Sequence, residues 1–319
     1  MALIHNNSIY IPSNSVIGPL QTRTFNKSNT YDYIIVGNNS IVSKYSFDNI
    51  QTKKIVIHKE CNISGSLNIS GLKCIEIEIH NNTSFIDVNY LFTLYKTLIS
   101  VKIHEKVEIY GDYIFLHCSV TNLHIGTGIK LFGNGTFNKC ANLIDIVIPD
   151  GASICGNLTF ADCIKVKSIS IGNNVTIIGD NIFSNCTSVE SISFGNNVTV
   201  VGNKMFSNCT NIESISFGDN VTINGTDNFE NCKIQTITTG ANFQNTDKSL
   251  CIYQRSYERV QFADIPEGTE CAISMGSFTI DSLIVKTICG HYFNENSLLT
   301  WLNQNNTCPM CRHQLNYNV

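Results

Sequence analysis

Charged residues are scarce in this sequence. Only 14% of its 319 residues are Asp, Glu, Lys or Arg, and 21 basic residues against 25 acidic ones give a formal net charge of -4. Proteins that hold the phosphate backbone of DNA or RNA need a field of clustered basic side chains. The composition therefore argues against a nucleic-acid partner.

Long apolar runs are missing as well. The stretch from Met1 to Ser8 has neither the basic region nor the apolar region of a secretory signal. No later window approaches the run of about 18 apolar residues that a membrane-spanning helix needs. We therefore expect a soluble protein of the cytoplasm (the host cytoplasm if the source is viral), with no membrane partner.

Cysteine, by contrast, is abundant, and its placement argues against a disulfide framework. The sequence holds 14 cysteines, and five of them recur at a constant interval of 23 residues: Cys140, Cys163, Cys186, Cys209 and Cys232. Four more belong to a Cys/His pattern near the C-terminus: Cys271, Cys289, Cys308 and Cys311. This spacing predicts buried, reduced thiols in the first set and metal thiolates in the second.

The interval of 23 residues belongs to a sequence repeat. Residues 142–164, 165–187, 188–210 and 211–233 align without gaps, which is decisive for a repeat architecture. One column of the alignment is glycine and another is phenylalanine: Gly133, Gly156, Gly179, Gly202, Gly225; Phe137, Phe160, Phe183, Phe206, Phe229. Phe115 with Cys118, then Phe92 and Phe47, carry a weaker form of the pattern toward the N-terminus.

Each unit predicts short strands separated by turns. In Ser168 to Ile171 the isoleucines alternate with serines, as expected of a strand with one buried face. A single 23-residue coil cannot bury its own apolar edge, but stacked coils can, so the phenylalanine and cysteine columns should form ladders through a core. The predicted fold is a mainly β repeat solenoid with a small C-terminal α+β zinc-binding domain.

These units resemble the leucine-rich repeats of the BspA-like family, whose pattern is approximately L-x-x-I-x-I-x-x-x-V-x-x-I-G-x-x-x-F-x-x-C. The resemblance implies an interaction scaffold rather than a catalyst. Four segments follow: an N-terminal cap or irregular segment (1–30), the solenoid (31–240), a solenoid cap and linker (241–268), and a zinc finger (269–319). Within the linker, Cys251 has no partner at ligand spacing and is expected to be structural.

The outward-facing strand positions should form the inner face of the solenoid. They are Glu76 and Glu78, Ser100 and Lys102, Asn122 and His124, Asp145 and Val147, Ser168 and Ser170, Ser191 and Ser193, Ser214 and Ser216, and Thr236 and Thr238. Two interpretations fit them: a strip that binds a protein partner, or a solvated ladder of small residues. No Ser/His/Asp set, phosphate loop or carboxylate pair stands out along the repeats.

The C-terminal segment contains the strongest chemical pattern. A Cys-x-His pair and a Cys-x2-Cys pair supply the four ligands of a closed tetrahedral zinc site: Cys289, His291, Cys308 and Cys311. Between the pairs, Leu298, Leu299, Trp301 and Leu302 have the spacing of a short amphipathic helix.

This segment resembles a RING finger of the RING-H2 kind, in which four ligand pairs interleave to hold two zinc ions. The second and fourth pairs are intact here. The first and third pairs fall on Cys271 with Ser274 and on Asn294 with Ser297. The resemblance implies one structural zinc, with hydrogen bonds replacing the metal at the first site, as in U-box and SP-RING proteins.

The same resemblance implies a RING-type ubiquitin ligase that acts without a covalent intermediate. A ubiquitin-conjugating enzyme would dock on Ile273, Trp301 and Pro309, Arg312 would be the linchpin toward ubiquitin, and the solenoid would hold a protein substrate. A SUMO ligase and a non-catalytic interaction protein are the alternatives. A secreted adhesin, common among BspA-like proteins, is disfavoured by the RING resemblance and the missing signal sequence.

Overall fold

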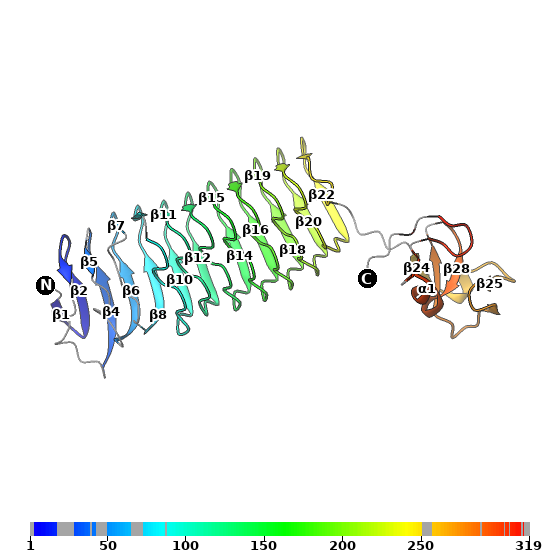
Figure 1. Cartoon of the computed structure of the whole chain (residues 1–319), viewed down its shortest axis with the longest axis horizontal. Helices are drawn as coiled ribbons and strands as arrows, with labels where there is room; N and C mark the ends of the chain where they lie inside the picture. The colour runs from blue at the N-terminus through cyan, green and yellow to red at the C-terminus, as the bar shows by residue number, and fades with distance from the viewer. Residues whose placement is uncertain are drawn as a thin grey trace. The chain divides into compact units, whose positions relative to one another are not determined.

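The computed structural model describes residues 3–17, 29–38, 40–42, 50–64, 73–86, 88–250, 257–287, 289–302, 304–305, 307–313 and 315. The chain divides into two compact units, Met1–Ile252 and Tyr253–Val319 (Figure 1). The first is a stack of coils and the second is a small mixed module. Within the described part of the chain, no helix has the length and apolar character needed to cross a membrane.

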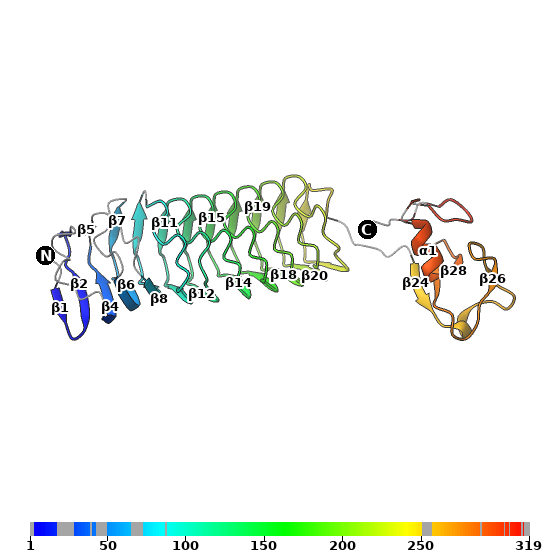
Figure 2. The same cartoon turned by 60° about the horizontal axis from the view of Figure 1, so that its bottom comes forward.

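The first unit is a β-solenoid in which each coil gives one strand to each of two rows (Figure 2). The first row is parallel except at its start and consists of two sheets. One sheet contains β1 (Leu3–His5), β2 (Ser8–Ile11), β4 (Thr30–Val36), β6 (Gln51–Ile57), β8 (Lys73–Ile79), β10 (Ser100–Ile103) and β12 (Asn122–Ile125). The other contains β14 (Asp145–Ile148), β16 (Ser168–Ile171), β18 (Ser191–Phe194), β20 (Ser214–Phe217) and β22 (Thr236–Thr239).

The second row is a continuous parallel sheet of shorter strands. Its members are β7 (Asn62–Ser64), β9 (Ser84–Ile86), β11 (Glu108–Tyr110), β13 (Lys130–Phe132), β15 (Ser153–Cys155), β17 (Thr176–Ile178), β19 (Thr199–Val201), β21 (Thr222–Asn224) and β23 (Gln244–Asn245). The short pair β3 (Val16–Ile17) and β5 (Ile41–Val42) lies in the preceding coils. The predicted repeat solenoid is therefore confirmed.

The predicted phenylalanine ladder runs through the core. Rings from consecutive coils stack at centroid distances of 4.9 to 5.5 Å from Phe92 through Phe229. These side chains are at most 2% exposed. Phe47 lies outside the described residues. Offset stacking of this kind adds to the burial of apolar area, so one residue type recurs in every coil.

The cysteine column is a second core ladder. Each thiol donates to the backbone carbonyl of a phenylalanine in the preceding coil, as in Cys186 Sγ to Phe160 O at 3.4 Å and Cys209 Sγ to Phe183 O at 3.3 Å. Burial raises the pKa of the Cys140 and Cys163 thiols. The column is thus built of core thiols that hydrogen-bond to backbone, in agreement with the structural role predicted for it. Cys251 lies outside the described residues.

Asparagine forms ladders on the surface that the sequence pattern did not reveal. Asn174, Asn197, Asn220 and Asn242 each adopt positive φ, and the amide of each later residue donates to the one before it at 2.9 to 3.1 Å. Asparagine tolerates the left-handed conformation better than most residues. The many asparagines of the repeat thus serve turn geometry and coil-to-coil hydrogen bonding.

The ends of the solenoid differ in detail from the segments expected from the sequence. The parallel pairing starts with β2 against β4, so it begins inside the segment assigned to the N-terminal cap, and antiparallel β1 covers that edge. Residues 241–268 divide between the two units: β23 extends the solenoid, whereas β24 (Tyr257–Val260) belongs to the C-terminal module.

The C-terminal module combines a three-stranded antiparallel sheet with one helix. The sheet contains β24, β27 (Ile284–Thr287) and β28 (Tyr292–Asn294). A hairpin of β25 (Glu270–Cys271) and β26 (Gly276–Ser277), a 3-10 turn (Phe262–Asp264) and helix α1 (Glu295–Leu302) complete it. The predicted helix is confirmed, since Leu298 and Leu302 are buried and Trp301 packs against the same core.

Candidate functional site

The four residues of the intact ligand pairs come together in the C-terminal module. Cys289 and His291 lie in the turn between β27 and β28, and Cys308 and Cys311 lie in the loop after α1. Their ligand atoms all lie within 4.8 Å of one another. The two pairs are separated in sequence by the whole of β28 and α1, so the tertiary fold creates this cluster.

The spacing of these atoms fits a zinc ion. His291 Nδ1 lies 3.5 Å from Cys289 Sγ and 3.6 Å from Cys308 Sγ. Tetrahedral zinc with ordinary Zn–N and Zn–S bonds separates such atoms by about 3.5 Å. Burial raises the pKa of Cys308 to about 11, whereas a backbone hydrogen bond from His313 lowers the pKa of Cys311. Metal binding must therefore displace the Cys308 proton.

Thr287 holds the first of these turns and was not predicted from the sequence. Its side chain is almost fully buried, its hydroxyl donates to His291 O at 3.0 Å, and the His291 amide donates back to Oγ1 at 3.1 Å. Thr287 Oγ1 also lies 3.2 Å from Cys289 Sγ. One side chain thus positions both ligands of the pair, in the manner of outer-shell residues around metal sites. A threonine two residues before Cys-x-His was the available signal.

The degenerate ligand pairs also meet, but they form a hydrogen-bonded cluster. Cys271 is 1% exposed, and its Sγ accepts the backbone amides of Ser274 at 3.5 Å and Asn294 at 3.3 Å. Burial alone would raise the pKa of Cys271, but hydrogen bonds from the Ser274 side chain and these amides outweigh it and lower the pKa. Backbone donors thus surround the single remaining sulfur.

Asn294 stands at a position that holds a zinc ligand in RING-H2 fingers, but here its side chain caps a helix. It directly precedes α1, and its Oδ1 accepts the amide of Ser297 in the first turn at 3.4 Å. This is the bond of a helix N-cap, which satisfies one of the free amides at a helix start. Glu295 lies in the same turn and pairs with Arg259 Nε at 2.8 Å, which ties β24 to the helix.

We expect Asn294→Ala to destabilise the module by about 1 kcal/mol, because it removes the cap of α1. Asn294→Asp is the matched control, since aspartate caps as well as asparagine and adds a favourable charge at the helix start. Thermal unfolding followed by the fluorescence of Trp301 reports on this module alone, as Trp301 is the chain's single tryptophan. Equal loss in both variants would contradict the capping role.

A surface groove lies beside the vacated pairs. It has a volume of about 350 Å³ and is lined by Ile273, Ser274, Ser297, Thr300, Trp301, Gln304 and Asn305. Trp301 is half-buried, and its indole Nε1 donates to Thr307 O at 2.8 Å, which fixes the ring between helix and loop. Two of the three predicted docking residues, Ile273 and Trp301, therefore share one apolar groove.

The other two predicted functional residues lie on the loop after α1. Pro309 is half-buried between the two cysteines, and Arg312 is exposed with a φ of 59°. Neither is among the described residues that line the groove. The Arg312 amide donates to Cys308 O at 2.9 Å, so the ligand loop sets the position of the arginine backbone.

The solvent-facing side of the first solenoid row changes character along its length. Strands β16, β18 and β20 present serines, and β22 presents threonines, whereas β6 to β14 present most of the charge, on Lys54, Glu76, Glu78, Lys102 and Asp145, together with His124. Burial opposes ionisation of Glu78, but hydrogen bonds from Lys54 and His104 outweigh it and lower its pKa to about 2.

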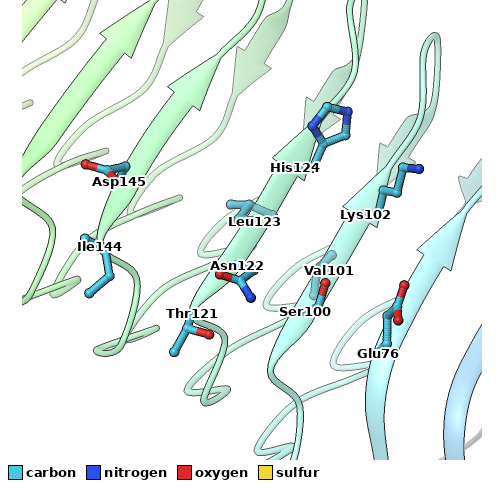
Figure 3. Close-up of a pocket in the computed structure, with 10 residues that line it drawn as sticks. All are labelled: Glu76, Ser100, Val101, Lys102, Thr121, Asn122, Leu123, His124, Ile144 and Asp145. Carbon is cyan, nitrogen blue, oxygen red and sulfur yellow. The ribbon is translucent and has the colours of Figure 1, made fainter.

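A pocket of about 350 Å³ opens in this charged part where the first row is interrupted (Figure 3). Strands β12 and β14 belong to different sheets, and Leu123 is only half-buried, whereas Val101 and Ile146 at the equivalent positions are fully buried. Polar side chains of four consecutive strands surround it, namely Glu76, Ser100 and Lys102, Asn122 and His124, and Asp145.

Comparison with protein families accounts for both units. The description "BspA type Leucine rich repeat region" matches residues 19–144 and 130–257, with 6 copies of the repeat. The chain is a BspA-type leucine-rich repeat protein. A solved leucine-rich repeat protein of T. pallidum (TpLRR) aligns with 13% identity and a TM-score of 0.36, covering 66% of this chain and 87% of that one. The family assignment depends on the repeat match.

The C-terminal module of this BspA-type protein is a RING finger, and RING fingers bind zinc. The description "Ring finger domain" matches residues 269–312. The mouse "E3 ubiquitin-protein ligase RNF181" is 30% identical over 60 residues, which are 19% of this chain and 36% of the ligase. The Drosophila melanogaster "E3 ubiquitin-protein ligase Iruka" is 33% identical over 57 residues, 18% of this chain and 15% of that ligase. The chain thus spans about a third or less of the curated relatives it matches.

Proposed function

We propose that this protein is a RING-type ubiquitin ligase whose finger recruits a ubiquitin-conjugating enzyme and whose solenoid binds a protein substrate. The observation that carries the proposal is the groove beside the vacated ligand pairs, which Ile273 and Trp301 line together. The named relatives of the finger, each a ubiquitin ligase by description, support it.

The finger would act by position and not by covalent chemistry. Docking on Ile273, Trp301 and Pro309 would hold the conjugating enzyme, and exposed Arg312 would contact its thioester-linked ubiquitin. Holding reactants in a productive pose accelerates transfer without a nucleophile on the ligase. A zinc ion held by Cys289, His291, Cys308 and Cys311 would have four protein ligands, so it would keep the ligand turns in place without activating water.

We further propose that the finger holds one zinc ion, bound by Cys289, His291, Cys308 and Cys311. At the first site, Cys271 has amide donors in place of metal, and Asn294 is a helix cap. Serine and asparagine oxygens are poor zinc ligands compared with thiolate and imidazole. Three such replacements leave the first site with a single good ligand.

The charged part of the solenoid is the proposed substrate surface. Its pocket on strands β8 to β14 offers two carboxylates, a lysine and a histidine around partly exposed Leu123. A protein segment with an apolar side chain flanked by charged groups fits this lining. The serine-bearing strands beyond β14 offer little charge and small side chains, so we assign them no contact.

An autoubiquitination assay with zinc-loaded protein and a panel of conjugating enzymes tests the ligase activity. Ile273→Ala and Trp301→Ala should each reduce the rate of chain formation tenfold or more, since loss of a central interface residue costs about 2 kcal/mol or more. Arg312→Ala should reduce the rate of transfer while conjugating-enzyme binding persists. Ile280→Ala is the matched control, because Ile280 is 82% exposed and lies outside the groove.

The outcome separates the alternative functions. Equal rates for Ile273→Ala, Arg312→Ala and the Ile280→Ala control would contradict the ligase assignment and favour a non-catalytic scaffold. Transfer of SUMO but not ubiquitin by the wild-type protein would identify a SUMO ligase.

A further inference from the structure

A short column of histidines stands on the solenoid, far from the finger in sequence. His58, His80 and His104 each follow directly after a strand of the first row, β6, β8 and β10. The equivalent positions in the next coils hold no side chain that can bind a metal: Gly126, Pro149, Gly172 and Gly195. Because adjacent parallel strands pair Ile57 with Ile79 and Ile79 with Ile103, the histidines lie one above another.

The last two histidines converge on one carboxylate. Their rings stack with centroids 4.9 Å apart and an interplanar angle of 21°. Glu78 lies two residues before His80, hence on the same face of the strand. Its Oε1 lies 2.7 Å from His104 Nε2 and 3.7 Å from His80 Nε2. The three potential ligand atoms lie within 4.8 Å of one another.

Lys54 orients this carboxylate. It contacts the other oxygen, Glu78 Oε2, at 2.5 Å and also binds Glu76 at 2.9 Å. Glu78 thus turns one oxygen to the lysine and the other to the two imidazoles. The Glu78 side chain is only 14% exposed, and those of His80 and His104 are 39% and 26% exposed, so the cluster is ordered by packing yet open to solvent.

We propose that Glu78, His80 and His104 form a second metal site that takes a divalent transition-metal ion of the zinc type. Two imidazoles and one carboxylate are a donor set that zinc uses where it keeps a fourth position open. Tetrahedral zinc separates nitrogen and oxygen ligands by about 3.3 Å, between the two distances from Oε1 to the histidines. Small rotations of the side chains therefore suffice.

We expect this site to bind zinc more weakly than the finger does. Lys102 Nζ lies 3.7 Å from the same Glu78 Oε1 and repels a cation there. The donor set contains no thiolate, whereas the finger offers three. A chelator of intermediate strength should therefore remove metal from the solenoid and leave the finger loaded. The open coordination position lies on the charged face, where a histidine or carboxylate of a partner can complete it.

Calorimetric titration of the full, zinc-loaded chain with zinc, after passage over a weak chelating resin, tests the site. We expect one further equivalent to bind, and the His80→Gln/His104→Gln variant to lose this uptake. His58→Gln/His124→Gln is the matched control and should bind as the wild type does, since neither residue belongs to the cluster. Lys102→Met should tighten binding severalfold, because it removes the competing charge.

Cobalt gives a second readout that distinguishes the two sites. Cobalt on the solenoid should show no thiolate charge-transfer absorption, whereas cobalt in the finger should show it. Absence of a further equivalent, or unchanged uptake by the His80→Gln/His104→Gln variant, would overturn the proposal. Neither outcome depends on ligase activity, so these experiments test the solenoid metal site independently of the function proposed for the finger.

Discussion

Cys308→Ser is expected to unfold the C-terminal module while the solenoid stays folded. Cys308 is a fully buried member of the ligand cluster and lies 3.6 Å from His291 Nδ1. Structural zinc contributes about 10 to 16 kcal/mol of apparent binding free energy in small fingers, more than a module of this size can spare. The emission of Trp301 should shift to that of solvent-exposed tryptophan, and a strong chelator should produce the same change in the wild type.

The solenoid should be unaffected by this substitution. Its coils are stabilised by the phenylalanine and cysteine ladders, and the two units have separate cores. Circular dichroism should therefore keep the β signal of the stacked strands after the tryptophan signal has changed. Loss of both signals in one transition would contradict independent folding of the two units.

Cys271→Ser is the informative partner of this variant. In a finger with two zinc ions both substitutions would remove a metal ligand. With one zinc, Cys271→Ser replaces one hydrogen-bond acceptor with another, so the variant should retain its finger zinc and most of its stability. Metal analysis after treatment with a weak chelator measures this directly. Loss of zinc from Cys271→Ser would contradict the single-zinc finger.

Restoring the missing ligands offers a test in the opposite direction. The triple variant Ser274→Cys/Asn294→His/Ser297→Cys recreates the RING-H2 pattern at the first site. It should bind one more zinc than the wild-type finger, because Cys271 and the two backbone segments already face one another. Failure to bind would mean that the vacated site has changed its backbone as well as its side chains.

The solenoid could be predicted because its determinants repeat. The same side chain recurs every 23 residues, so periodicity alone places Phe183 above Phe160 and Cys209 above Cys186. Each coil contacts only its neighbours, so the structure of one coil, repeated along the axis, describes the whole stack. The same logic fails before residue 96, where the glycine and cysteine columns fade, although strands β2 to β8 continue the sheet.

The residues that escaped prediction act through contacts that no repeat encodes. Thr287 holds the Cys-x-His turn through bonds specific to that turn, and β24 joins a sheet whose other strands lie more than twenty residues later. The cluster of Glu78, His80 and His104 needs the register of two strands before its members meet. Sequence spacing predicted the Cys/His cluster of the finger, whose four potential ligand atoms do lie together, because zinc sites have a characteristic number and chemistry of ligands.

Gly202→Ala is expected to destabilise the solenoid by about 3 kcal/mol, through overpacking and backbone strain. Gly202 has a φ of 155°, and a Cβ there would lie 2.0 Å from the carbonyl oxygen of Gly179 and 2.7 Å from its carbonyl carbon. Both contacts are with backbone, which cannot rotate away as a side chain can. The two coils must therefore move apart, which weakens the core ladders on both sides of the substitution.

Gly151→Asn is the control for Gly202→Ala. It tests whether the loss of stability comes from the close backbone contact at Gly202 or from replacing any glycine with positive φ. Gly151 also has a positive φ, at 69°, but a Cβ there finds its nearest atom at 3.9 Å. The position is equivalent to Asn174, Asn197 and Asn220, so asparagine fits the conformation and extends their ladder. Its stability should stay within about 0.5 kcal/mol of the wild type. Denaturant unfolding followed by circular dichroism measures the free energy of unfolding of both variants. If Gly202→Ala is as stable as Gly151→Asn, the distance between neighbouring coils can increase at little cost, which would contradict the prediction.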